Sequence, residues 1–202
     1  MALTSDIDLE YKQMIEKAAR KEDDLEVPNS TLGHALLVYS FLIGTTEKDL
    51  RILTGYAEEI DYKEIREGLE NLAKKFREPY KQFNFNPLWF KAFGIKQKPP
   101  IQRRIKILLS EEESYGSDFY NFARDYKDVI KMKRFRNPNH MTPHFLISDE
   151  RAYREEEKHS KEALKDYNIR AIANFNDSSK SFILGKFFDH CWNLEDRLLP
   201  IQ

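Results

Sequence analysis

Residues 142–155 of the chain read TPHFLISDERAYRE, and this stretch fixes the centre of the predicted fold. Apolar residues dominate 144–148, and Ala152 and Tyr153 follow in a second short segment. The pair Asp149-Glu150 between the two segments is polar and begins with a residue type that favours turns. The stretch therefore predicts a β-hairpin, with strands over His144–Ser148 and Arg151–Glu155.

Strands and helices alternate along the chain around this hairpin. Short apolar runs predict further strands at 48–55, 104–110, 129–135 and 169–175. Apolar residues three or four positions apart predict helices at 32–45, 62–76, 118–126 and 180–194. Strands that alternate with helices predict an α/β fold, in which a mixed, mostly parallel sheet carries helices on both faces.

Residues 1–28 are expected to form an N-terminal helical arm, and residues 29–202 the α/β domain. Apolar residues at helical spacing predict a helix over Ile7–Arg20. The charged residues 21–26 and Pro28 interrupt this pattern, so a loop is expected there.

A basic, aromatic insertion is predicted within the domain, at about 77–103. Residues 74–106 contain ten Lys or Arg, one acid and four prolines, and the prolines argue against one long helix. The aromatic side chains could stack on nucleic-acid bases, form a protein interface, or simply pack beneath a long loop. A second basic cluster within 131–136 favours nucleic acid slightly. The candidate binding residues are Trp89, Phe90, Lys91, Lys96, Arg103 and Arg104.

The composition excludes several classes of protein. Hydrophobic residues make up 41% of the chain, which is enough to build a core. The formal net charge is −1, so no global attraction to polyanions is expected. Cys191 is the only cysteine, which rules out a disulfide within the chain and a cysteine-rich zinc site. No apolar run is long enough to span a bilayer, and we expect a cytoplasmic protein without membrane contact.

In this order of elements, the chain resembles one half of the phospholipase D superfamily, whose single-half bacterial nucleases pair as dimers. The resemblance covers about Asn29 to Arg197. It rests on LRILTG at 50–55, IKILLS at 105–110, TPHFLISD at 142–149, and a closing strand and helix that ends at Trp192. It implies a phospholipase D-like half that forms a homodimer or a hetero-oligomer with other subunits.

The family's catalytic motif is His-x-Lys, then four residues and Asp, with Gly-Ser-x-Asn further on. Its His attacks phosphorus, and its Lys and Asn hold phosphate oxygens. Aligning the motif on Asp149 places Thr142 at the His position and His144 at the Lys position. The Gly-Ser-x-Asn region falls near 154–157, which reads REEE. The resemblance therefore implies a degenerate active site.

A polar pocket is expected to survive without the chemistry. The Arg154 guanidinium suits phosphate or carboxylate, and Thr54 and Ser110 end strands, where ligands bind in α/β sheets. The other interpretation is that such residues cap helices and close turns. The predicted pocket consists of Thr54, Ser110, His144, Asp149, Arg154 and Asn174.

Catalysis by displaced histidines is the alternative. His140 or His144, with Asp149, would then serve a phosphodiesterase or nuclease, although no Lys stands at the required spacing. The spacing of His140, His144 and His159 matches no known metal site, so neither a metal nor another cofactor is expected. We therefore expect a non-catalytic binding, sensor or assembly subunit of a prokaryotic nucleic-acid-handling or antiviral defence complex.

Overall fold

The computed structural model describes residues 6–20, 25–29, 31–55, 60–78, 103–110, 118–137, 143–157 and 170–201. Its helices are α1 (Asp6–Arg20), α2 (Leu32–Thr45), α3 (Lys63–Arg77), α5 (Asp118–Asp125) and α7 (Ser178–Trp192), with a 3₁₀ turn, η2, at Glu195–Arg197. Its strands are β1 (Glu26–Asn29), β2 (Asp49–Thr54), β3 (Arg104–Leu109), β4 (Ile130–Phe135), β5 (His144–Ser148), β6 (Ala152–Glu156), β7 (Ala171–Asn174) and β8 (Leu198–Ile201). Most of the predicted insertion, residues 79–102, lies outside the described residues.

The strands of the described residues form one sheet in the order β1-β7-β6-β5-β2-β3-β4-β8. β2 pairs in parallel with β3, and β3 with β4, whereas the other five neighbouring pairs are antiparallel. The predicted mixed sheet with helices on both faces is confirmed. The prediction that the sheet is mostly parallel is wrong, because the hairpin and two additional edge strands contribute antiparallel pairs.

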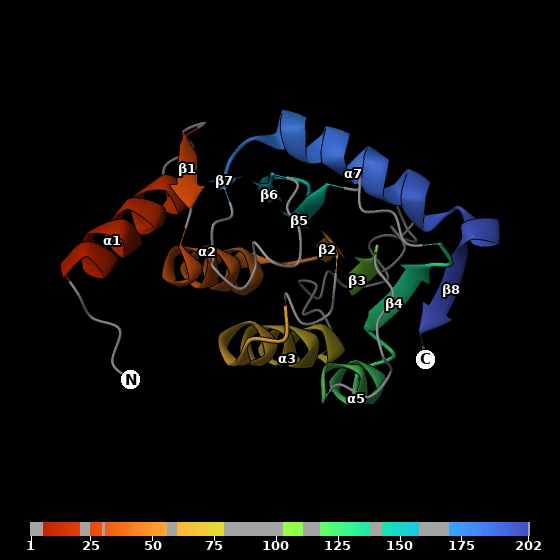
Figure 1. Ribbon diagram of the computed structural model, residues 1–202. Helices are drawn as coiled ribbons and strands as arrows, with labels where there is room; N and C mark the ends of the chain where they lie inside the picture. Colours follow the sequence, from red (N-terminus) through yellow and green to blue (C-terminus); the bar gives the residue numbers. More distant parts are fainter. Residues whose placement is uncertain are drawn as a thin grey trace, which may run out of the picture.

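Helices cover both faces of this sheet. Helix α7 runs along one face, and α2, α3 and α5 lie on the other (Figure 1). The alternation of side chains along β2 supplies both layers. Leu50 and Ile52 are buried in a core that they share with α2 and α3, whereas Leu53 is buried with Phe188 of α7. Ile15 of α1 lies in the first of these cores.

The two edge strands are the elements that the sequence does not predict. A loop is predicted at Pro28, but residues 26–29 form β1, which pairs with β7. The strand at 169–175 is predicted to be the last one, but β8 follows it and pairs with β4. Proline lacks the amide donor that an inner strand needs, so Pro28 and Pro200 suit edge strands.

A buried ion network joins β2 to α7. The Arg51 guanidinium lies 2.6 Å from Asp49, 2.9 Å from Glu150 and 3.5 Å from Asp189 of α7. Helix α7 passes over this guanidinium at Gly185, where a Cβ atom would lie 2.7 Å from Nη1. Glycine therefore allows α7 to approach the sheet closely enough for Asp189 to take part in the network.

The outer face of α7 is apolar as well as its inner face. Phe188 and Trp192 are buried against the sheet, but Phe182, Ile183 and Phe187 are exposed, Ile183 to 66%. These three exposed residues are called the α7 ridge below. None of the helices in the described residues, α7 included, is long and apolar enough to cross a membrane.

Candidate functional site

Four of the six predicted pocket residues lie toward one end of the sheet. Thr54 ends β2 and Ser110 follows β3, and the Ser110 amide donates to the Thr54 carbonyl at 2.9 Å. β5 runs antiparallel to β2 with Leu53 opposite Phe145, so His144 begins β5 at this same end. β6 returns beside β5 and brings Arg154 opposite Leu146 and Glu156 opposite His144.

Arg154, on β6, is the most deeply paired of these four residues, and only 3% of its surface is exposed. Its Nε donates to Asn29 Oδ1 at 2.9 Å, and its Nη1 donates to the Tyr39 hydroxyl at 3.3 Å and to the Glu156 carboxylate. The guanidinium also lies over the Tyr39 ring, 4.7 Å from its centroid. Burial alone would lower the pKa of Arg154, but Glu156 and the two nearby phenols, Tyr39 and Tyr11, raise it above the usual value. Arg154 is therefore a permanent, internally paired cation.

Glu156 contacts both Arg154 and His144 at this end of the sheet. One carboxylate oxygen pairs with Arg154, and Oε2 lies 3.7 Å from Nδ1 of His144. The side chains of His144 and Glu156 are only 12% and 10% exposed. The nearly buried Glu156 carboxylate lies between the Arg154 guanidinium and the His144 imidazole, where it would repel an anionic ligand. We call Arg154, Glu156 and His144 the Arg154 cluster.

Helices α1 and α2 close the Arg154 cluster on one side. The Tyr11 hydroxyl of α1 donates to the Pro28 carbonyl at 2.9 Å, and the Tyr11 ring stacks on His34 of α2 at 3.6 Å. Burial raises the pKa of Tyr11 to about 12, although Arg154 opposes the shift. The neutral phenol therefore persists at physiological pH, and the N-terminal segment belongs to the wall of the cluster.

Asp149 lies at the other end of β5, so the structure does not bring it to His144. Its carboxylate accepts hydrogen bonds from the amides of Glu47, Lys48 and Asp49 at 2.7, 2.8 and 2.9 Å. Its backbone has a φ of 55°, which is the left-handed region that Asp tolerates in turns. These contacts give Asp149 a structural function in holding the connection between α2 and β2.

Asn174 also lies apart from the Arg154 cluster. β7 begins beside Glu156 and ends at Asn174, opposite Tyr153. Asn174 Oδ1 accepts hydrogen bonds from the amides of Asn176 and Asp177 at 2.8 and 3.0 Å, which closes the turn into α7. The six predicted residues therefore do not form a single pocket, because Asp149 and Asn174 hold turns elsewhere.

The predicted nucleic-acid or partner residues fall mostly on undescribed segments. Trp89, Phe90, Lys91 and Lys96 lie outside the described residues, as do His140, Thr142 and His159. Arg103 Nη1 donates to the Lys75 carbonyl at 3.0 Å, and Arg104 Nε pairs with Asp49 at 2.8 Å. These two arginines make contacts within the fold, at the start of β3.

Glu156, Tyr39 and Asn29 are the members of this site that sequence reasoning does not identify. The alternation of a strand places residues 154 and 156 on one face, which is a local signal for Glu156. Asn29 and Tyr39 are more than a hundred residues away in sequence, and no local pattern links them to Arg154. Within the described ranges, no three His, Cys, Asp or Glu side chains are grouped to hold a metal ion.

Comparisons with known proteins place this arrangement in a fold family. No protein-family model matches the sequence, and no curated protein is significantly similar to it. Among solved structures, Nuc from Salmonella typhimurium, a phospholipase D family member, aligns with a TM-score of 0.56 at 13% identity, over 88% of this chain and 98% of that one. NucT from Helicobacter pylori aligns with a TM-score of 0.55 at 11% identity, over 88% and 99%. TrmBL2, an archaeal chromatin protein, aligns with a TM-score of 0.53 at 10% identity, over 93% of this chain and 59% of that one. The chain therefore has a phospholipase D-like fold.

Proposed function

We propose that this chain is a non-catalytic, phospholipase D-like binding subunit of a complex that handles nucleic acid, of the kind that serves prokaryotic antiviral defence. The observation that carries the proposal is the Glu156 carboxylate, which pairs with Arg154 and lies 3.7 Å from His144. The chain has retained the framework of the fold, but the Arg154 guanidinium at this end of the sheet is paired internally with Glu156.

Phosphoryl transfer requires a nucleophile and cations that are free to hold the phosphate oxygens. At the end of the sheet where β2 and β3 end and β5 begins, the Arg154 guanidinium and the His144 imidazole face Glu156 instead. A phosphodiester brought to this position would meet a carboxylate at close range, and the repulsion in a nearly buried site is strong. Binding without cleavage is the function that this geometry supports.

Nucleic acid is the class of ligand that the comparisons favour. TrmBL2, which has a similar fold, is described as a chromatin protein with a novel mode of DNA binding. The basic cluster at 131–136 supports the same class, because Lys and Arg side chains attract phosphate backbones even when a protein's net charge is near zero. The proposed role in sensing and antiviral defence rests on the degenerate form of the phospholipase D catalytic motif.

The purified chain is expected to bind labelled single- or double-stranded DNA or RNA at low salt, and to leave it uncut, because in the described part of the chain a carboxylate, Glu156, lies beside His144. The measurement is a gel assay of binding and of cleavage, with and without added divalent metal. If the chain cuts nucleic acid, and if His144→Ala abolishes this cleavage but the exposed control His190→Ala does not, the proposal is wrong and the chain is an active phosphodiesterase. Absence of all binding at low salt would overturn the nucleic-acid class.

Assembly with another subunit is the second part of the proposal. The α7 ridge exposes three large apolar side chains side by side, and such patches on soluble proteins mark protein contacts. Light scattering is expected to give a mass above the 24.0 kDa of one chain. Ile183→Glu should reduce the mass to that of one chain, whereas Leu9→Glu, at an exposed position of α1, should not. A wild-type chain that is monomeric at high concentration would argue against self-assembly.

A further inference from the structure

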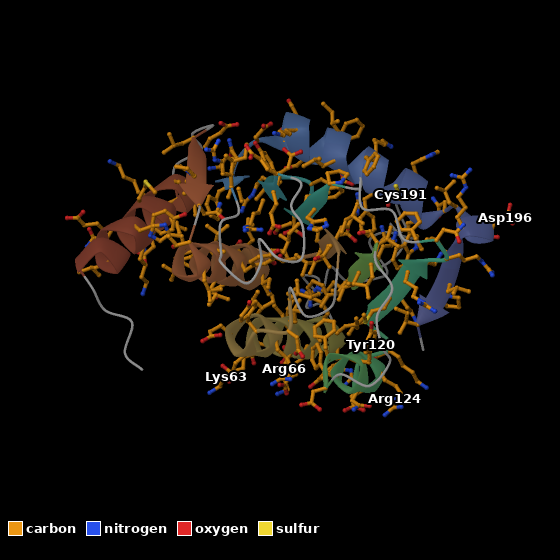
Figure 2. The ribbon with its side chains drawn as sticks, viewed as in Figure 1. Lys63, Arg66, Tyr120, Arg124, Cys191 and Asp196 are labelled. Carbon is orange, nitrogen blue, oxygen red and sulfur yellow. The ribbon has the colours of Figure 1, made fainter. Side chains whose placement is uncertain are left out.

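A basic groove lies at the edge of the sheet, on the side where α5, β4 and β8 meet. Its volume is about 770 Å³, within the range of natural ligand sites. β8 pairs with β4 only from Met132 to Phe135, so Ile130 and Lys131 extend past its end and form the floor. Figure 2 shows Tyr120 and Arg124 projecting from α5 on this side. The walls are completed by Lys127, Lys133 and Trp192.

Four cations line this groove, and no carboxylate of the described residues forms an ion pair with any of them. Lys131 Nζ donates to the Lys127 carbonyl at 2.7 Å, and Lys133 Nζ donates to the Trp192 carbonyl at 2.9 Å. Arg124 Nη2 donates to the side-chain oxygen of Asn121 at 2.9 Å. These acceptors are all neutral, so none of these hydrogen bonds cancels the positive charge of the groove.

Two carboxylates, Asp125 and Asp128, lie next to these cations in sequence, and Asp128 is already engaged. Asp128 receives three hydrogen bonds from Arg77, at 2.6, 3.0 and 3.1 Å. The hydrogen bonds from Arg77 lower the pKa of Asp128, and the nearby Lys131 contributes to the same shift. The net charge of −1 for the whole chain therefore conceals a local concentration of positive charge.

This groove is distinct from the Arg154 cluster. β2, β3 and β4 run in parallel, and the cluster lies where β2 and β3 end, next to Thr54 and Ser110. The groove lies at the opposite end, where β4 begins with Ile130 paired to Ile105. A ligand in the groove consequently would not contact His144.

We propose that this groove binds the phosphate backbone of a single-stranded nucleic acid, which deepens and rests on the proposed function. Arg124, Lys127 and Lys131 follow one another along α5 and into β4, as a row of exposed cations that a polyphosphate chain can track. The Tyr120 side chain packs against the core, and the Trp192 ring is covered by Lys106 and Lys133 at 5.2 and 4.8 Å, so the cations supply the contacts of this groove.

A single strand fits this site better than a duplex or an acidic peptide. The groove is recessed between α5 and Trp192, so a flexible backbone can enter it, whereas a rigid duplex would touch only the rim. An extended peptide would bind by adding a strand to β8, but Pro200 removes a backbone donor from that edge. The groove therefore offers its cations for contact with the phosphates of a single strand.

The test is the triple variant Arg124→Gln, Lys127→Gln, Lys131→Gln in the full chain. Its matched control changes three exposed lysines elsewhere, Lys12→Gln, Lys17→Gln, Lys186→Gln, with the same loss of charge. Fluorescence anisotropy with labelled oligo-dT and oligo-U over a range of salt gives the affinity and its salt dependence. Each phosphate contact contributes about 0.7 to the slope of log K against log salt. The triple variant should lower that slope by about 2, and lower the affinity by about 100-fold at 0.1 M salt.

Each result decides between the alternatives. If the triple variant and its control bind the oligonucleotides with equal affinity, the groove is not the binding site. The proposed function would then depend on another surface. Loss of all wild-type binding at low salt would overturn both. Poly-glutamate that displaces either oligonucleotide at lower concentration than the unlabelled strand would assign the groove to an acidic protein instead. Protection of Lys127 and Lys131 from amine labelling in the complex provides a readout that needs no variant, and its absence also contradicts the groove.

Discussion

Replacing Arg154 by Met is expected to lower the free energy of unfolding by about 4 kcal/mol, since removal of one partner of a buried ion pair leaves the other uncompensated. Arg154 is 3% exposed and is bonded to Asn29, Tyr39 and Glu156. Without the guanidinium, the Glu156 carboxylate and the Asn29 oxygen lose a buried donor. For a chain of this length, the corresponding fall in Tm is about 10 °C.

A double-mutant cycle separates the energy of the Arg154–Glu156 ion pair from the energy that the Arg154 side chain contributes by packing. Glu156→Leu added to Arg154→Met removes both charges, and should recover roughly 2 kcal/mol relative to Arg154→Met alone. Urea unfolding followed by tryptophan fluorescence measures all four proteins of the cycle. A loss of less than about 1 kcal/mol for Arg154→Met, which is the value of an exposed pair, would contradict a buried, stabilising pair between Arg154 and Glu156.

Asp149→Ala is expected to lower the free energy of unfolding by about 3 kcal/mol. The substitution leaves the amides of Glu47, Lys48 and Asp49 without their charged acceptor. Alanine also tolerates a φ of 55° less well than Asp does, which adds about 1 kcal/mol to the loss. Thermal unfolding by circular dichroism is the measurement.

Asp149→Asn is the matched control for that prediction. Asparagine retains the left-handed conformation and one neutral oxygen acceptor, so we expect it to lose less than half as much stability. If both variants are as stable as the wild type, the three amide contacts do not anchor the connection between α2 and β2. A catalytic Asp149 would then need to be considered again, despite its distance from His144 along β5.

Helix α2 shows how far local sequence can determine structure. The helix predicted at 32–45 is observed with those bounds. Thr31 accepts a hydrogen bond from the His34 amide at 3.2 Å and so caps its first turn. The edge strands β1 and β8 have no such local signal. Each has four residues and contains a proline, and each exists only because a distant strand offers it hydrogen bonds.

The Arg154 cluster could not be predicted because its members depend on the exact register of the hairpin. A two-residue turn at Asp149-Glu150 would pair His144 with Glu155. The observed loop also includes Arg151, so Ser148 pairs with Ala152 and His144 pairs with Glu156. The one-residue shift brings Glu156 rather than Glu155 opposite His144. Charges on both residues look alike in the sequence, and only the turn conformation distinguishes them.

The pairing of β1 with β7 has a consequence for how the protein is made. Val27 lies opposite Ala173, so the first strand of the chain reaches its place only through a partner synthesised near the end. On the ribosome, β1 must remain without hydrogen-bond partners while most of the chain emerges, and closing so long a loop slows folding. Asn29, which ends β1, binds Arg154 only after this step. The Arg154 cluster is therefore completed late, after translation has passed β7, so nascent chains stalled before that point lack it.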